Sequence, residues 1–173
     1  IVDKFSTFVN PQIPISFRIE KLTGITDAMV LSAPTIETVL KEFLDFCGDA
    51  VLVAHNAEFD TSFIANKAQK QGITVTILDT VLLAQFVIPN LHNYKLDTLC
   101  KHLGVSLENH HRAVDDAGAT ADAFIKLIEM LKERDIFDLE MLNEKGELDV
   151  DSIRKLHQYH CIILAANESI CTV

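Results

Sequence analysis

The sequence lacks the features that mark membrane proteins, secreted proteins and zinc-finger proteins. None of its apolar runs approaches the roughly 20 residues that a membrane-spanning helix needs. Its first residues show no basic segment followed by an apolar run and a cleavage site. Its four cysteines are widely spaced and contain no Cys-x-x-Cys pair. We therefore expect a cytoplasmic protein with reduced thiols and no membrane contact.

Positive charge is also scarce, because 25 acidic residues against 15 basic residues leave a net charge of −10. A protein that binds nucleic acid tightly on its own draws much of its affinity from Lys and Arg on phosphates. The composition argues against such a protein. It does not exclude an enzyme that handles a few nucleotides through metal ions held by carboxylates, with another chain or domain supplying a basic surface.

What the sequence does contain is enough for one folded domain: 173 residues, of which 49% are hydrophobic and 23% charged. Apolar periodicity predicts strands that alternate with helices, which indicates an α/β fold. The predicted strands cover residues 1–10, 50–54 and 73–78, with a last one inside YHCIILAA near the end of the chain. The predicted helices cover 17–24, 34–47, 80–88, 96–103 and 116–133, and an amphipathic stretch runs from 59 to 68.

A change of composition suggests where the domain ends. Near residues 138–152 the chain becomes polar, acidic and glycine-containing, as in NEKGELDVD, and we interpret this segment as a linker. The strand pattern YHCIILAA that follows is too short to form a domain of its own.

A carboxylate-containing turn follows the strand predicted at 50–54. That strand, AVLVA, is apolar throughout, as is typical of a strand buried on both faces, and HNAEFD comes directly after it. Ligands gather outside the carboxyl ends of strands in α/β sheets, and a carboxylate such as Asp60 could bind a divalent metal there. The alternative is that Asp60 and Glu58 are only favourable residues in the first turn of a helix.

The segment HHRAVDD offers two His-x4-Asp pairs, His110 with Asp115 and His111 with Asp116. A histidine titrates near neutral pH and can take a proton from water, so either pair could combine a general base with a metal-binding carboxylate. A hydrogen-bonded loop histidine is the alternative for each.

Helical phase favours the second pair. On the helix predicted from residue 116, Asp116 shares a row with apolar positions that end at Leu127, whereas Asp115 falls on the face that carries Lys126. We therefore expect Asp116 to point toward the protein body and Asp115 toward water. A carboxylate turned inward is costly unless it is paired or bound to a metal.

Taken together, HNAEFD and HHRAVDDAGAT resemble the second and third motifs of the DEDDh exonucleases. The surrounding sequence agrees with the family in order, with LTGITDAMV before the two motifs and LDTVLLAQF and NYKLDTLCKHLGVSLEN between them. The resemblance implies an RNase H-like α/β fold, in which a mixed central sheet is flanked by helices.

Within that superfamily the chain most resembles the exonuclease domain of PolC-type DNA polymerase III α subunits. In those polymerases the exonuclease is inserted in a PHP domain. The resemblance therefore implies an exonuclease domain over residues 1–137, with a linker and the start of a resumed PHP segment over 138–173.

The resemblance also implies a chemistry, namely proofreading by two-metal hydrolysis of the terminal phosphodiester at the 3′ end of single-stranded DNA. Asp60 and Asp116 would hold two divalent ions, Mg²⁺ or Mn²⁺, and His111 would be the general base. The turn His55-Asn56 and the pair Thr23-Gly24 would contact the terminal nucleotide. For Thr23-Gly24 a helix C-cap is an equal alternative. The other implied partners are the remainder of the polymerase and the replisome.

One motif of the family has no counterpart here. The DEDDh enzymes carry an Asp-x-Glu on their opening strand, and the early acidic residues Asp3 and Glu20 lack that setting. Two carboxylates alone bind a hard cation weakly, so we expect the chain as it stands to be poorly active or inactive. Two other functions remain open: a non-catalytic interaction module of the replisome, and a DEDDh exoribonuclease.

Overall fold

The computed structural model describes residues 2–48, 50–58, 77–107, 113–134 and 161–164. Its helices are α1 (Phe17–Thr23), α2 (Asp27–Val30), α3 (Ile36–Cys47), α5 (Thr80–Val87), α6 (Leu96–Leu103) and α7 (Ala113–Lys132). Its strands are β1 (Val51–Ala54), β2 (Ile77–Asp79) and β3 (Cys161–Leu164). Within these ranges, no helix is long and apolar enough to cross a membrane.

The three strands form one parallel sheet in the order β2-β1-β3. Ala54 at the end of β1 lies opposite Asp79 of β2 on one side and Leu164 of β3 on the other. Because all three strands run in the same direction, their carboxyl ends meet at one edge, which we call the carboxyl edge. The resemblance implies a mixed sheet, but the strands that the structure describes are all parallel.

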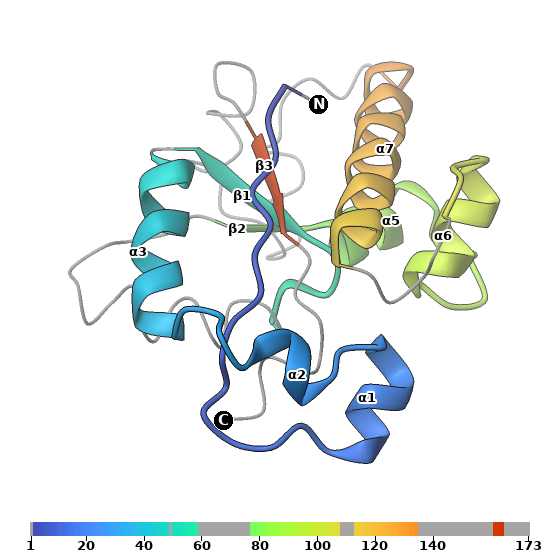
Figure 1. Ribbon diagram of the computed structural model, residues 1–173. Coiled ribbons are helices and arrows are strands. Elements are labelled where there is room, and N and C mark those ends of the chain that lie inside the picture. The colour runs from blue at the N-terminus through green and yellow to red at the C-terminus, as the bar shows by residue number, and fades with distance from the viewer. Residues whose placement is uncertain (1, 49, 59–76, 108–112, 135–160, 165–173) are drawn as a thin grey trace.

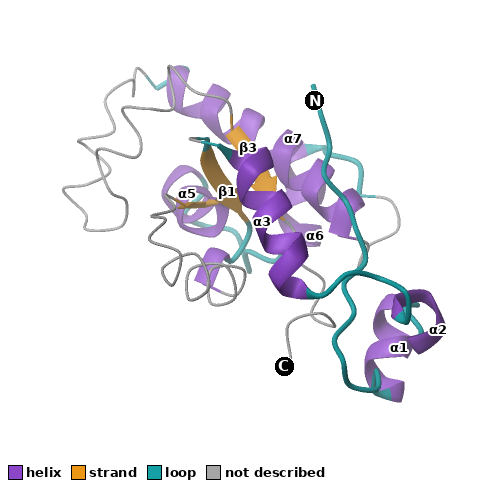
Figure 2. Cartoon of the chain, turned by 60° about the vertical axis from the view of Figure 1, so that its left-hand side comes forward, coloured by secondary structure: helices purple, strands orange, loops and turns teal. Residues whose placement is uncertain are grey.

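Alternate side chains of β1 enter two separate cores, as the period of a strand requires. Val51 and Val53 pack in a cluster with residues of α5, α6 and α7, whereas Leu52 and Ala54 pack with Cys47 at the end of α3. All four strand residues are buried. Figure 1 shows the resulting layers, with α3 on one side of the sheet and α5, α6 and α7 on the opposite side, and Figure 2 shows the same arrangement with α3 turned toward the viewer. The prediction of a strand buried on both faces is confirmed.

The sequence signals for helices are also largely confirmed. The helices α1, α3, α5 and α6 begin and end within two residues of the predicted ranges. The helix α7 begins at Ala113 instead of residue 116. This earlier start puts Asp115 and Asp116 in the first helical turn, where negative charge is favourable next to the helix N-terminus.

The first ten residues differ from the expectation. We predicted a strand over 1–10, but across the described residues 2–10 the structure shows only an isolated bridge, which joins Asn10 to Thr35. One of its apolar side chains packs on a helix instead: the ring of Phe5 meets the ring of Phe43 on α3, with centroids 5.8 Å apart. Phe5 is therefore explained by packing on α3, whereas Phe8 is 42% exposed.

The strand predicted inside YHCIILAA is confirmed as β3, which pairs with β1 along its full length of four residues. It therefore belongs to the same sheet as β1 and β2. The predicted linker at 138–152 and the amphipathic stretch at 59–68 lie outside the described residues.

Two glycines with different backbone conformations allow a matched stability test. Gly104 follows α6 with φ of 65°, in the left-handed region, and the next N–H, of Val105, donates to the Cys100 carbonyl at 2.8 Å. Gly118 lies inside α7, and an added Cβ would meet nothing within 4 Å. At Gly104 an added Cβ would come no closer than 4.0 Å to the flexible end of Lys126, so neither site is sterically blocked.

We expect opposite effects from alanine at these two positions. Gly104→Ala should lower the free energy of unfolding by about 1 kcal/mol, because alanine is strained at positive φ. Gly118→Ala should raise it by up to about 1 kcal/mol, because alanine is the better residue inside a helix. Urea denaturation followed by circular dichroism measures both values. Changes of the same sign would contradict this explanation.

Candidate active site at the carboxyl edge of the sheet

Three residues of the predicted site, His55, Asn56 and Asp116, lie on the side of the carboxyl edge. The turn of His55 and Asn56 follows β1 directly at this edge, and Asp79 ends β2 beside it. Asp116 lies in the first turn of α7. The other two predicted chemical residues, Asp60 and His111, lie outside the described residues.

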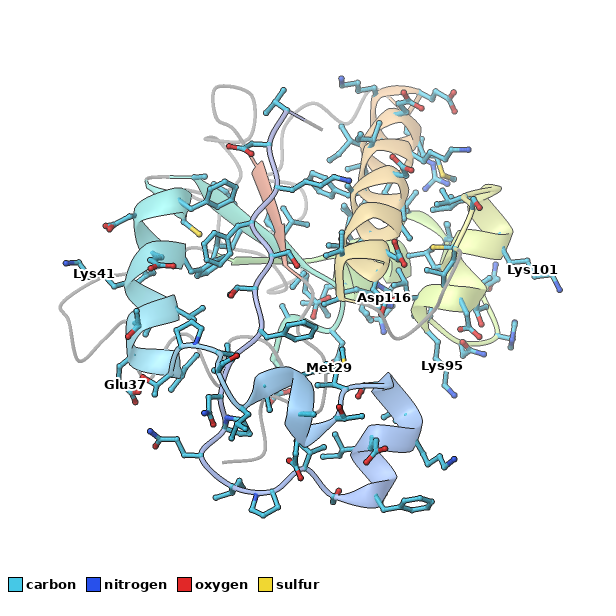
Figure 3. All side chains as sticks on the ribbon, viewed as in Figure 1. Met29, Glu37, Lys41, Lys95, Lys101 and Asp116 are labelled. Atoms are coloured by element: carbon cyan, nitrogen blue, oxygen red, sulfur yellow. The ribbon has the colours of Figure 1, made fainter. Side chains whose placement is uncertain are left out.

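One hydrogen bond fixes which end of α7 lies near this edge. The helix α5 begins at the carboxyl edge, directly after β2, and runs back along the sheet to Val87. Arg134, just beyond the end of α7, donates from Nη2 to the Val87 carbonyl at 2.8 Å. The end of α7 therefore lies by the end of α5, and its start lies on the side of the carboxyl edge. Figure 3 shows Asp116 at that end of the helix.

Asp116 borders the buried stripe of α7, as helical phase predicts. Thr120 and Leu127, which continue its row, are 1% and 0% exposed, and Asp116 itself is half-buried. The expectation that Asp115 faces water is wrong in part, because Asp115 is also half-buried. The reason is that Ala119, one turn further on, is itself buried against the core. Helical phase still distinguishes the row of Asp116 from the row of Asp115, but the two rows differ less in burial than the sequence suggested.

Asp116 is one of three carboxylates whose charge acts on the Cys100 thiol. Burial raises the pKa of the Cys100 thiol on α6 from 9.0 to about 11, and the carboxylates of Asp116, Asp122 and Asp97 contribute further to that rise. A half-buried carboxylate in such surroundings is a suitable oxygen donor for a hard divalent cation. Residues 2–58, 77–107 and 113–134, without position 49, contain no group of three or more potential metal ligands. The described residues thus contain no complete metal cage, and a ligand role for Asp116 remains a prediction.

His55 is held by both of its ring nitrogens. Nδ1 lies 2.9 Å from the Thr80 hydroxyl at the start of α5, and Nε2 lies 2.8 Å from the Tyr94 carbonyl. Only an N–H can pair with a carbonyl, so Nε2 carries a hydrogen. Burial lowers the pKa of His55, although the Tyr94 carbonyl and the charges of Asp79 and Asp97 oppose that shift. The Thr80 hydroxyl also lies 3.3 Å from the Ala54 carbonyl. A nucleotide contact by His55 remains a prediction. Both of its ring nitrogens have partners within the protein, the Thr80 hydroxyl and the Tyr94 carbonyl.

Asn56 has a backbone conformation that few residues adopt. Its φ is 66°, in the left-handed region that asparagine tolerates better than most residues. The Asn56 N–H donates to one carboxylate oxygen of Asp79 at 3.1 Å, and the Ala57 N–H donates to the other at 3.0 Å. The exposed Asn56 side chain remains a candidate contact for a terminal nucleotide.

Thr23 and Gly24 form a helix C-cap, which is one of the two alternatives that the sequence left open. Gly24 has φ of 72°, and its N–H donates to the Glu20 carbonyl at 2.8 Å. The Thr23 hydroxyl donates to the Ile19 carbonyl at 2.9 Å and accepts from the Ile25 N–H at 3.1 Å. A nucleotide contact by this pair remains a prediction.

Sequence reasoning missed Asp79 and Thr80. Asp79 fell between the strand predicted at 73–78 and the helix predicted at 80–88, and Thr80 was only the first residue of that helix. A usable signal was present, since strands predicted at 50–54 and 73–78 would end side by side if they were parallel neighbours. Polar residues directly after both strands then become candidates for contact with each other.

Comparisons with known proteins agree with this arrangement. The model of the exonuclease family (RNase_T) matches residues 1–124. The chain is 54% identical to DNA polymerase III PolC-type of Caldanaerobacter subterraneus subsp. tengcongensis over 97% of its length. It is 49% identical to that of Clostridium perfringens and 39% identical to that of Bacillus subtilis, each over 98%. In each case it spans only 12% of the relative.

A solved structure extends the comparison to three dimensions. The chain is similar to exonuclease X in complex with 5′ overhanging duplex DNA, with a TM-score of 0.57 and 26% identity over 74% of each chain. The family match covers well over half of the chain. The chain therefore belongs to the exonuclease family and is an exonuclease domain with an RNase H-like fold.

Proposed function

We propose that this chain is the proofreading 3′–5′ exonuclease domain of a bacterial replicative DNA polymerase of the PolC type. The observation that carries the proposal is the combination of two matches over the same residues. The chain matches the exonuclease family, and it is up to 54% identical to PolC-type polymerases over nearly its whole length. An exonuclease within a replicative polymerase has an obvious task, which is removal of mispaired nucleotides from the 3′ end.

The proposed reaction is hydrolysis of the terminal phosphodiester, with release of a nucleoside 5′-monophosphate. Asp60 and Asp116 would hold two divalent ions, Mg²⁺ or Mn²⁺, which suit carboxylate ligands. When bound, such ions stabilise the charge on the attacking and leaving oxygens. The half-buried position of Asp116 at the start of α7 supports its role as a ligand. His111, two residues before α7 in the sequence, would take the proton of the attacking water.

The proposed partners follow from the charge and from the relatives. With a net charge of −10, this chain is poorly suited to grip DNA alone, and the rest of a polymerase would supply the basic surface. The proposed substrate is the 3′ end of single-stranded DNA, and the proposed site of action is the replisome in the cytoplasm. We also propose that the exonuclease domain ends near residue 137 and that a PHP segment resumes within 138–173. The strand β3 comes after this boundary in the sequence but pairs with β1, which comes before it. The sheet therefore contains strands from both sides of the boundary.

The proposal is tested with labelled single-stranded oligonucleotides of the same sequence in DNA and RNA. The assay uses the 173-residue chain and a longer polypeptide that carries it, with Mg²⁺ or Mn²⁺. We expect the longer polypeptide to shorten the DNA from its 3′ end, to release nucleoside 5′-monophosphates and to stop when EDTA is added. Faster degradation of RNA would favour an exoribonuclease. Binding to other replisome proteins without any nuclease activity would favour the interaction module.

A further inference from the structure

A single carboxylate connects the two chain segments that meet at the carboxyl edge. Oδ1 of Asp79 accepts from the Asn56 N–H at 3.1 Å and from the Val81 N–H at 2.8 Å. Its Oδ2 accepts from the Ala57 N–H at 3.0 Å. Asp79 is thus the N-cap of α5 and also an acceptor for the turn after β1.

The next residue adds a second connection between the same segments. The Thr80 side chain is 1% exposed, and its hydroxyl lies 2.9 Å from His55 Nδ1 and 3.3 Å from the Ala54 carbonyl. The other nitrogen of His55 pairs with the Tyr94 carbonyl at 2.8 Å. The turn is therefore attached to the start of α5 by both side chains of the Asp79-Thr80 pair and to the loop before α6 by the imidazole.

These contacts oppose a conformational cost. A non-glycine residue with positive φ is uncommon and persists where the surrounding structure holds it. Asn56 has φ of 66°, and residues 57 and 58 are already helical, so the N–H groups of Asn56 and Ala57 need acceptors outside their own helix. Asp79 supplies both acceptors from a different part of the chain.

We propose that Asp79 and Thr80 are positioning residues for the exonuclease site. They act by fixing the turn that presents Asn56. In the sequence, Asp60 follows three residues after Ala57 of that turn. This inference rests on the proposed function, because it assumes that the turn serves a nuclease. Neither residue touches the substrate or a metal in this proposal. Each acts through the backbone or the imidazole of the turn.

The first test measures the turn itself and needs no activity. In Asp79→Asn one oxygen can still accept from Asn56 and Val81, but the amide NH₂ would face the Ala57 N–H, donor against donor. We expect amide hydrogen exchange of Ala57 to accelerate at least about tenfold, with Val81 less affected. The matched control is Asp97→Asn, in the first turn of α6, where the carboxylate accepts from the Thr98 N–H at 2.8 Å. Unchanged exchange of Ala57 in Asp79→Asn would overturn the proposal.

The second test measures the site in the longer polypeptide that carries the chain. Residues that orient a metal ligand typically change metal affinity or activity by about 10- to 100-fold. We expect Asp79→Asn to raise the Mn²⁺ concentration for half-maximal activity by about that factor and to lower kcat more than it raises KM for the oligonucleotide. A calorimetric Mn²⁺ titration should show the same loss of affinity. Asp97→Asn removes an exposed charge that also acts on His55 but makes no hydrogen bond to the turn, so it should change these values far less than Asp79→Asn does.

The two proposals fail differently. An inactive wild-type polypeptide would reject the proposed function. An active wild type with an equally active Asp79→Asn, at the same Mn²⁺ dependence, would reject only the positioning role.

If Asp79→Asn does not fold, Thr80→Val and Thr80→Ser decide the question. Thr80→Val removes the hydroxyl at nearly constant volume, and Thr80→Ser keeps it. We expect the Mn²⁺ midpoint to rise in the valine variant and to stay near the wild-type value in the serine variant. Equal midpoints in both would overturn the proposal.

Discussion

Replacement of Asp116 by asparagine is expected to lower the rate of 3′ nucleotide removal by roughly 100- to 1000-fold and to leave the fold intact. The loss follows because a metal at such a site supplies several kcal/mol of transition-state stabilisation, and each 1.4 kcal/mol or so is tenfold in rate. Asparagine has the shape of aspartate but not its charge, so packing at the half-buried start of α7 should be preserved. Circular dichroism checks the fold, and a labelled oligonucleotide in a polypeptide that carries the chain checks the rate.

Two variants on the same helix make this result specific. Asp122→Asn removes the same charge from an exposed position that also lies near Cys100, and it should retain nearly full activity. Asp115→Asn tests the choice between the two His-x4-Asp pairs, and it should cost far less activity than Asp116→Asn. If Asp115→Asn were the inactive variant, His110 and Asp115 would be the functional pair and the argument from helical phase would be wrong.

The second large effect concerns stability. Leu127→Ala is expected to lower the free energy of unfolding by about 2–5 kcal/mol, because it leaves a cavity at a fully buried position. Leu127 is 0% exposed and belongs to the cluster in which α7 meets β1, α5 and α6. A domain is usually stable by only about 5–15 kcal/mol, so this substitution could remove a large part of the total. Urea denaturation at 25 °C measures the change.

A neighbouring residue provides the control for that measurement. Ile125 lies on the same helix but is 55% exposed, so Ile125→Ala removes a similar side chain without opening a cavity. We expect a change within about 0.5 kcal/mol, as for most surface substitutions, and alanine is also the better helix former. Equal losses for Leu127→Ala and Ile125→Ala would mean that the cluster around α7 contributes no more to stability than the surface does.

Local signals predicted the helices and the central strand well. The apolar spacing and the glycine after it were enough for α3 and α6, since both are properties of a single segment. The strand over residues 1–10 was predicted wrongly because a pattern within ten residues does not reveal its partner, which for the ring of Phe5 is α3. The position of β3 beside β1 was likewise beyond sequence reasoning, because pairing between segments so far apart depends on the whole sheet.

The same division holds for the candidate site. Helical phase identified the buried row that continues from the half-buried Asp116, a property of one helix. It misjudged Asp115, whose burial depends on what lies against the first turn. The contacts of Asp79 and Thr80 depend on the register that sets Ala54 opposite Asp79. No single segment contains that register, so these residues became visible only when the two strands lay side by side.

The alternation of side chains along β1 has an evolutionary consequence. No residue of this strand belongs to both cores, because Leu52 and Ala54 face the α3 side and Val51 and Val53 face the α7 side. Substitutions beneath α3 can therefore accumulate, and adapt that layer to whatever lies against it, without repacking the layer that carries Asp116. Divergence among relatives should be unequal between the two layers, with tighter restriction of residue size on the α7 side than on the α3 side.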